Sequence, residues 1–252
     1  MMKYISKFKI NNYTYVFFLI CALCGYIKNI SIIFFICFIH ELGHIFFIKL
    51  FKYKIIKIEF YPFGGFTKLE KKINTSINKD LVIAFGGIFF QIVFILILFL
   101  LKNKINFITY NLFVNYNLIL ILFNMIPIIP LDGNNIIHLL LEKFFSYYMS
   151  YYINFIISII CLVLFLMINY IYHLDNYFII SFLFYKSVEY IKNFKYLKHR
   201  FLIERYLYDF EYRKIDNDTK NIKHLRRNVF HYFKENNKYI SEKNIIKRNL
   251  NI

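Results

Sequence analysis

The sequence of 252 residues has few acidic residues and few prolines. Asp and Glu number 15 against 32 Lys and Arg, which gives a formal net charge of +17 at pH 7. No recognisable nucleic-acid-binding motif accompanies this charge, so we expect no nucleic-acid partner. Of the three prolines, Pro127 and Pro130 stand three positions apart, a spacing that an undisturbed helix interior cannot contain. A helix is therefore expected to end there.

Cysteine is scarce as well, with four in the chain. Cys21 and Cys24 have the CxxC spacing of many metal and redox sites, but the sequence contains no second pair. The surrounding residues are apolar, and a free cysteine in such a stretch behaves as a small hydrophobic residue. Packing is therefore favoured over metal binding or redox chemistry at these two positions.

Hydrophobic residues, in contrast, are abundant. They make up 59% of the chain, aromatic residues make up 22%, and the mean hydropathy is +0.47. This composition is too apolar for a soluble domain of this length and predicts an all-α polytopic membrane protein. About six transmembrane helices are expected, over Tyr13–Ile27, Ile30–Ile48, Leu81–Leu101, Ile105–Ile126, Ile153–Ile171 and Tyr177–Ile191.

The basic residues indicate how these helices are oriented, because cytoplasmic loops collect Lys and Arg. With the N-terminus inside, 29 of the 32 basic residues fall in segments predicted to be cytoplasmic. Both ends of the chain are then cytoplasmic. We predict a six-span domain over residues 1–191 and a basic cytoplasmic tail over 192–252, whose charge is suited to contact with anionic lipids.

The pentapeptide His40-Glu41-Leu42-Gly43-His44 is an HExxH metal signature inside an apolar run. Residues four apart lie on one face of a helix, so His40 and His44 can bind one metal ion together. Glu41 lies about 100° around the same turn, where its carboxylate can take a proton from water. Short patterns of this kind also recur by chance, but ionisable residues within a span are costly and are functional candidates by default. The motif predicts hydrolysis at membrane depth with Zn²⁺ as cofactor.

Two histidines leave a zinc site incomplete, because catalytic zinc usually has three protein ligands. Asp132 is the only acidic residue between Leu81 and Leu141, and it follows the proline pair, where a broken helix can place a carboxylate at membrane depth. Gly133 permits a tight turn, and Asn124 offers an amide for the substrate or a developing oxyanion. Taken alone, this segment is equally compatible with an ordinary surface turn.

A small membrane-associated β-hairpin is predicted over Lys54–Glu70, between the second and third spans. Residues that favour strands flank the turn-prone stretch Pro62–Gly65. Such a hairpin can offer an edge to an extended peptide, which is one mode of peptide recognition. A purely structural hairpin accounts for the pattern equally well.

Together these motifs resemble the site-2 protease family of intramembrane zinc metalloproteases, and in particular its sporulation branch. The likeness covers about residues 10–210 and lies in three places, namely His40-Glu41-Leu42-Gly43-His44, Asn124 with Pro127, Pro130 and Leu131-Asp132-Gly133, and Tyr61-Pro62-Phe63-Gly64-Gly65.

The resemblance implies a role for each matching residue. Zinc would be held by His40, His44 and Asp132, Glu41 would be the general base, and Asn124 would be a second catalytic residue. Substrate-binding roles are expected for the residues that flank this centre in the matching motifs, which are Phe63, Gly64, Gly65 and Pro130.

The sporulation branch also implies a class of substrate. This would be a membrane-associated, inactive transcription-factor precursor, such as a pro-sigma factor, and an inhibitory membrane protein would regulate its cleavage. The location would then be the mother-cell-derived membrane around the forespore. Relatives in this branch extend into a nucleotide-binding CBS-like domain. The tail here, with Arg200–Tyr212 and Lys223–Lys234, is expected to form amphipathic helices or a short remnant, and we assign no nucleotide binding to it.

Three other functions are compatible with parts of this pattern. A catalytically inactive, protease-like membrane scaffold would bind client proteins, but such proteins usually lose the base or a ligand, and all four residues are present here. A membrane-anchored peptidase of the soluble type would keep HExxH outside an apolar run. A transporter should show repeated halves around a broken helix pair, whereas this sequence contains one break.

Overall fold

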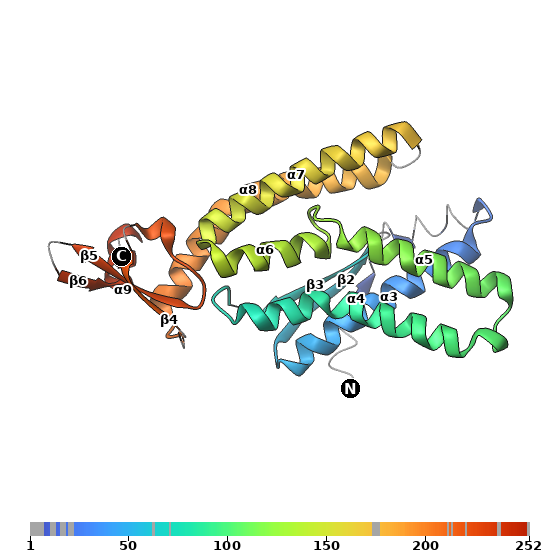
Figure 1. Cartoon of the computed structure of the whole chain (residues 1–252), viewed down its shortest axis with the longest axis horizontal. Coiled ribbons are helices and arrows are strands. Elements are labelled where there is room, and N and C mark those ends of the chain that lie inside the picture. The colour runs from blue at the N-terminus through green and yellow to red at the C-terminus, as the bar shows by residue number, and fades with distance from the viewer. Residues whose placement is uncertain are drawn as a thin grey trace. The chain divides into compact units, whose positions relative to one another are not determined.

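The computed structural model describes most of the chain (Figure 1). The described residues are 8–10, 14–15, 19, 23–61, 64–70, 72–172, 177–210, 212, 214–219, 221–235 and 238–250. They divide into two compact units, of which the first comprises Met1–Lys71 and Val82–Met125, and the second comprises Lys72–Leu81 and Ile126–Ile252. The predicted boundary at residue 191 between a membrane domain and a tail stays a prediction.

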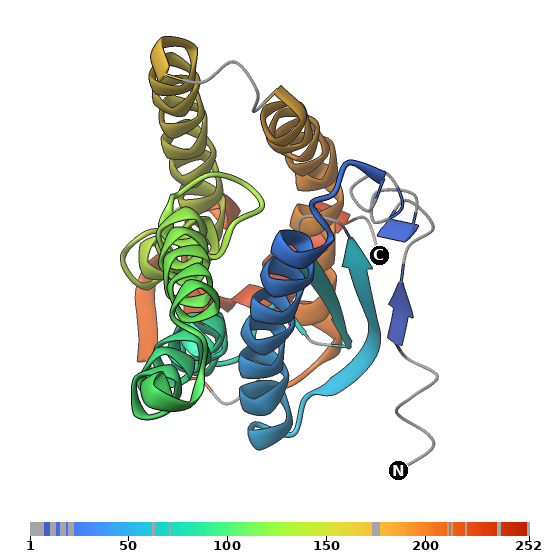
Figure 2. The ribbon, with the colours of Figure 1, turned by 90° about the vertical axis from the view of Figure 1, so that its right-hand side faces the viewer.

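The first unit combines long helices with a small sheet. The helices are α3 (Ile27–Leu50), the part of α4 (Ile77–Leu100) from Val82 onward, and α5 (Phe107–Met125). The sheet has the order β1 (Phe8–Ile10), β2 (Lys54–Tyr61), β3 (Gly64–Glu70). Figure 2 shows α3 alongside this sheet. The predicted segment Lys54–Glu70 therefore contains an antiparallel pair, β2 with β3, and a third strand, β1, joins β2 in parallel.

A cluster of buried isoleucines holds α3 against the sheet. Ile45 and Ile48 come from α3, while Ile55 and Ile58 come from β2, and each is less than a tenth exposed. The two helix positions are three apart and the two strand positions are also three apart, with a register shift between Ile55 and Lys57. This bulge explains how both isoleucines reach the same side, because strict alternation would place them on opposite faces.

Four helices among the described residues are long and apolar enough to span a membrane: Ile27–Leu50, Ile77–Leu100, Phe107–Met125 and Tyr147–Ile168. They correspond to the second through fifth predicted spans. Large apolar side chains stay exposed along them, for example Leu96, Leu100 and Leu122. Exposed apolar surface of this extent is what a lipid-facing helix requires.

The first and last predicted spans have a different outcome. The first, Tyr13–Ile27, lies largely outside the described residues. The last, Tyr177–Ile191, begins helix α8 (Tyr177–Leu207), which is not among the four candidates. Its charged residues Lys186 and Glu189 pair with each other at 2.7 Å. A total of six spans therefore stays a prediction.

The second unit contains the remaining helices and a second sheet. Its helices are α6 (Asp132–Phe144), α7 (Tyr147–Tyr172), α8 and α9 (Glu242–Leu250), and its sheet has the order β4 (Lys214–Thr219), β5 (Val229–Glu235), β6 (Lys238–Ser241). Its core is formed by residues of α7, α8, β5 and α9 and the loop before β5, namely Tyr147, Tyr148, Phe201, Leu202, Leu225, Phe233, Ile245 and Ile246.

The tail differs from the helical alternative considered above. Helix α8 ends at Leu207, and the segment Lys223–Lys234 contains the strand β5 instead of a helix. The segment is rich in residues that favour strands, and β5 pairs on both sides, in parallel with β4 and antiparallel with β6. Of the two alternatives, amphipathic helices or a short remnant, the helical one is wrong for Lys223–Lys234, because pairing with β4 and β6 makes this segment a strand.

The proline pair ends a helix, as predicted. Helix α5 stops at Met125, α6 starts at Asp132, and no helix or strand lies between them. Within the second unit, Ile128 is fully buried and the backbone N–H of Ile129 donates to Ser158 Oγ on α7 at 2.9 Å. The peptide bond between Ile129 and Pro130 is cis. The segment is thus a packed connection with its backbone polar groups partly satisfied by α7.

Candidate metal centre

The two histidines of the HExxH motif face each other on α3. Their Nε2 atoms are 3.1 Å apart, and their rings meet edge to face with centroids 4.7 Å apart. Both side chains are buried, with His40 at 6% and His44 at 9% exposure. The i, i+4 spacing on one helix face brings the rings together, as the sequence predicts.

Two residues of helix α4 form hydrogen bonds with the Nδ1 atoms of the two rings. His40 Nδ1 is 2.9 Å from Gln91 Oε1, and His44 Nδ1 is 2.8 Å from the backbone oxygen of Ile83. Both partners are acceptors, so the Nδ1 atom of each ring carries the proton and donates it. The Nε2 atoms of both neutral rings are then lone-pair acceptors that point at one another.

Two acceptors at 3.1 Å with no proton between them repel, and a cation between them removes the repulsion. Zinc binds neutral imidazole at about 2.0–2.1 Å, which places two tetrahedral nitrogen ligands roughly 3.3 Å apart. The observed separation is close to this value. A ligating histidine usually donates its other N–H to a carbonyl or carboxylate oxygen, which is what Ile83 and Gln91 provide. The residues present therefore fit a zinc ion.

Glycines let the helices approach closely enough for this arrangement. A Cβ atom on Gly87 of α4 would overlap the His40 ring. A Cβ atom on Gly43 of α3 would overlap the backbone of Gly86, and one on Gly86 would lie 2.8 Å from the Gly43 oxygen. The glycine inside HExxH and the pair on α4 therefore set the distance between the two helices, as small residues do in membrane helix packing.

Glu41 lies against the sheet of the same unit. Its side chain is buried, at 7% exposure, and a Cβ atom on Gly65 of β3 would lie 2.5 Å from the carboxyl carbon of Glu41. Only glycine leaves room for this carboxylate at that strand position. The structure thus brings the predicted base and one predicted substrate-binding residue, Gly65, side by side.

The other predicted site residues belong to both units, and one of them lies outside the described residues. Asn124 is in the last turn of α5 in the first unit, half-buried. Pro130 and Asp132 are in the second unit, and Asp132 is the first residue of α6. Gly64 pairs with Tyr61 in the sheet, and Phe63 lies outside the described residues. The roles of these residues stay predictions.

Gln91 contacts the metal centre but was not predicted from the sequence as a site residue. It is fully buried, holds His40, and is itself linked through its backbone oxygen to the amide of Asn117 on α5, at 3.0 Å. A signal was present, because Gln91 is the only residue with a polar amide in the uncharged stretch Leu81–Leu101. A buried amide in an apolar span needs a hydrogen-bond partner, but the sequence does not say which one.

Comparison with known proteins agrees with this centre. Residues 28–110, which include HExxH, Gly87 and Gln91, match the family model for Peptidase family M50. Together with the relatives below, this match shows that residues 28–110 are similar to peptidase family M50.

Two curated relatives and one solved structure are similar to the chain. Stage IV sporulation protein FB of Bacillus subtilis is 28% identical over 141 residues, which is 55% of this chain and 49% of the relative. Zinc metalloprotease MJ0392 of Methanocaldococcus jannaschii is 29% identical over 147 residues, 53% of this chain and 42% of the relative. The solved site-2 protease from Methanocaldococcus jannaschii has a TM-score of 0.59 at 21% identity and covers 73% of this chain and 90% of that chain.

The matched regions span about half the length of the curated relatives. The solved structure supports the fold, since its identity is 21%. The resemblance to the site-2 protease family found in the sequence is therefore confirmed, and so is the likeness to its sporulation branch.

Proposed function

We propose that the protein is an intramembrane zinc metalloprotease that cleaves a membrane-associated protein precursor. The observation that carries this proposal is the pair of Nε2 lone pairs of His40 and His44, held 3.1 Å apart at the centre of an apolar helix with Glu41 beside them. One curated relative is named as a zinc metalloprotease, and the similar solved structure is named as a site-2 protease.

The proposed site has three protein ligands. His40 and His44 would supply Nε2, with their rings fixed by Gln91 and Ile83. Asp132 would supply a carboxylate oxygen, because it is the acidic residue that the sequence places directly after the broken helix, and a carboxylate completes a common catalytic zinc set. Zinc bound there would polarise the scissile carbonyl and acidify a water molecule.

The remaining steps belong to side chains of this chain. Glu41 would accept a proton from the attacking water at its carboxylate and pass it to the nitrogen of the leaving amine. Its burial beside β3 keeps it close to any peptide held there. Asn124 would donate its amide hydrogen to the substrate or to the oxyanion.

Strand β3 provides a place to hold the substrate extended. Among the described strands, β3 pairs only with β2 and lies at the edge of the sheet order β1-β2-β3. An extended peptide can add to such an edge through backbone hydrogen bonds. Because Gly65 of β3 lies against Glu41, a peptide in this position would pass the base. Phe63, Gly64 and Pro130 are proposed to contact it on the grounds of the family resemblance.

The substrate class is proposed from the sporulation relative. It would be a membrane-bound transcription-factor precursor such as a pro-sigma factor, and a membrane protein inhibitor would control its cleavage. The enzyme would act in the bacterial membrane, or in the membrane around the forespore in a spore-forming source. The basic tail would contact anionic lipids.

Two variants test the proposal directly. The parent, Glu41→Gln and Asp132→Asn would each be co-expressed with a tagged precursor, and its cleavage would be measured by electrophoresis. Glu41→Gln should lose cleavage and retain zinc, whereas Asp132→Asn should lose both. The catalytic assignment is wrong if Glu41→Gln cleaves as fast as the parent. Zinc binding unchanged in Asp132→Asn would remove Asp132 from the ligand set alone.

A further inference from the structure

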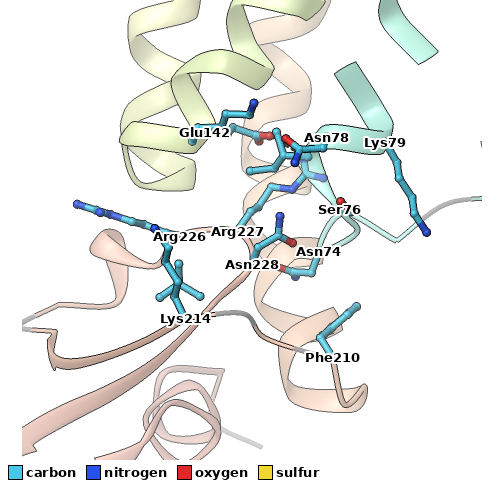
Figure 3. Close-up of a pocket in the computed structure, with 13 residues that line it drawn as sticks. Asn74, Ser76, Asn78, Lys79, Glu142, Phe210, Lys214, Arg226, Arg227 and Asn228 are labelled. Atoms are coloured by element: carbon cyan, nitrogen blue, oxygen red, sulfur yellow. Dashed lines mark hydrogen bonds and ion pairs between the residues drawn. The ribbon is translucent and has the colours of Figure 1, made fainter. Parts of the chain in front are cut away.

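The second unit contains a pocket that is lined only by its own residues. Its volume is about 520 Å³, which is in the range of small-molecule sites. Three segments line it, around the start of α4, the end of α6 and the strands β4 and β5 (Figure 3). The lining residues whose charge or hydrogen bonding matters are Asn74, Lys79, Glu142, Lys143, Lys214, Arg226 and Arg227.

The lining is strongly positive. Five of its residues are basic and one, Glu142, is acidic. Glu142 is already paired, because Arg227 Nη1 donates to its carboxylate. The side chains of Lys143, Lys214 and Arg226 are exposed and make no ion pair with residues that the structure describes. The field inside the pocket therefore favours an anion.

Arg227 forms the rigid part of the pocket. It is 6% exposed and donates to three acceptors from different segments, which are Glu142 on α6, Asp80 on α4 at 2.7 Å, and the backbone oxygen of Thr75 at 2.9 Å. Burial alone would raise the pKa of Glu142, but the charges of Arg227 and His138 and their hydrogen bonds lower it to about 2. The network is thus ionised at neutral pH and ties the three segments together.

Two buried donors in the lining have no acceptor. The atoms are Asn74 Nδ2 and Arg227 Nε, and neither has a hydrogen-bond partner among the described residues. The orientation of the Asn74 amide is fixed, because its oxygen accepts from Arg205 Nη1 at 3.3 Å. Buried polar groups are nearly always paired, and an unpaired donor of this kind is satisfied by an acceptor oxygen. Both atoms are shielded from solvent behind the pocket wall, so direct contacts to an anion would come from the exposed side chains of Lys143, Lys214 and Arg226.

We propose that this pocket binds a phosphate group. A phosphate supplies several acceptor oxygens and negative charge, and it forms charge-assisted hydrogen bonds with Lys and Arg. All three lining segments belong to parts of the chain that the charge distribution places on the cytoplasmic side of the membrane. Two sources of phosphate are present on that side, namely the headgroups of anionic phospholipids and free phosphate in the cytoplasm.

The test uses the full chain and two double variants. The pocket variant is Lys214→Gln with Arg226→Gln, and the control is Lys192→Gln with Lys195→Gln on α8, which removes the same charge from exposed positions outside the pocket. Calorimetric titration of inorganic phosphate into protein held in phosphatidylcholine nanodiscs measures the soluble source. Native mass spectrometry of protein taken from mixed phosphatidylglycerol and phosphatidylcholine micelles counts retained phosphatidylglycerol and measures the lipid source.

We expect the parent and the control to bind alike and the pocket variant to bind at least about tenfold more weakly. Inorganic phosphate binding that the pocket variant loses identifies a soluble ligand. Retained phosphatidylglycerol that the pocket variant loses, without inorganic phosphate binding, identifies a lipid headgroup. The proposal is overturned if the parent binds neither probe, or if both double variants weaken binding equally. The thermal unfolding midpoint without ligand should be the same for all three proteins, because the substituted side chains are exposed.

Discussion

The metal centre of the first unit and the phosphate pocket of the second satisfy their buried polar groups in opposite ways. Around His40 and His44, the partners are a backbone carbonyl and an uncharged amide, and the two Nε2 atoms face each other. Around Arg227, the partners are two buried carboxylates and a backbone carbonyl. Uncharged partners keep the imidazoles neutral, which is the form that binds zinc, whereas carboxylate partners neutralise a buried cation.

The strongest test of this contrast is removal of the central charge of the second unit. Arg227→Met should destabilise the protein by about 3–5 kcal/mol, because it leaves Glu142 and Asp80 buried without their cation. Thermal or denaturant unfolding of the full chain in detergent would measure the loss.

A neighbouring arginine provides the control for this prediction. Arg226→Met removes the same charge from an exposed side chain and should change stability by less than about 0.5 kcal/mol. Equal losses in the two variants would mean that net charge, and not the buried network, determines the effect.

In the first unit, the corresponding test removes an uncharged partner. Gln91→Leu deletes the acceptor that orients His40, and zinc affinity should fall by about 10–100-fold, as expected for the loss of a partner behind a metal ligand. Competition with a zinc chelator would measure the change. Gln91→Glu retains an acceptor oxygen and should preserve most of the affinity. If Gln91→Leu binds zinc like the parent, Gln91 does not position His40.

The smallest predicted effect concerns pH and the tail. Burial lowers the pKa of His231 to about 4, helped by the charge of Arg205, from an ordinary value of 6.5. His231 Nε2 accepts from the backbone N–H of Arg226, so the folded state holds the neutral ring. The unfolded state binds the proton more readily, and stability should therefore fall as the pH drops below about 6.5.

Between pH 7 and 5.5 this loss should be about 1 kcal/mol. It would be measured as a lower unfolding midpoint in the parent and should be smaller in His231→Gln. A pH dependence that is unchanged in His231→Gln would assign the effect to another group. Glu142 does not contribute in this range, because its pKa of about 2 keeps it ionised.

Much of the first unit could be predicted from the sequence because its signals are local. The HExxH spacing, the helix end before Pro127 and the strand segment Lys54–Glu70 each depend on neighbours within a few residues. Gly86 and Gly87 lie against α3, but which helix they face could not be predicted from their local sequence.

The remainder depends on partners distant in the sequence. Gln91 holds a histidine 51 positions away, and Arg227 pairs with residues 85 and 147 positions away. Strand β5 pairs with β4 and β6, and the residues of Lys223–Lys234 alone do not show these pairings. Single-sequence patterns contain no information about which distant polar residues meet.

The most direct measurement of the central claim is the zinc content of the purified full chain, compared with that of His40→Ala and His44→Ala. We expect about one zinc ion per parent chain and a large loss in each variant, because both Nε2 atoms are needed to hold the ion. A parent free of zinc under conditions that retain it in other zinc enzymes would contradict the account, as would zinc that remains bound in both variants.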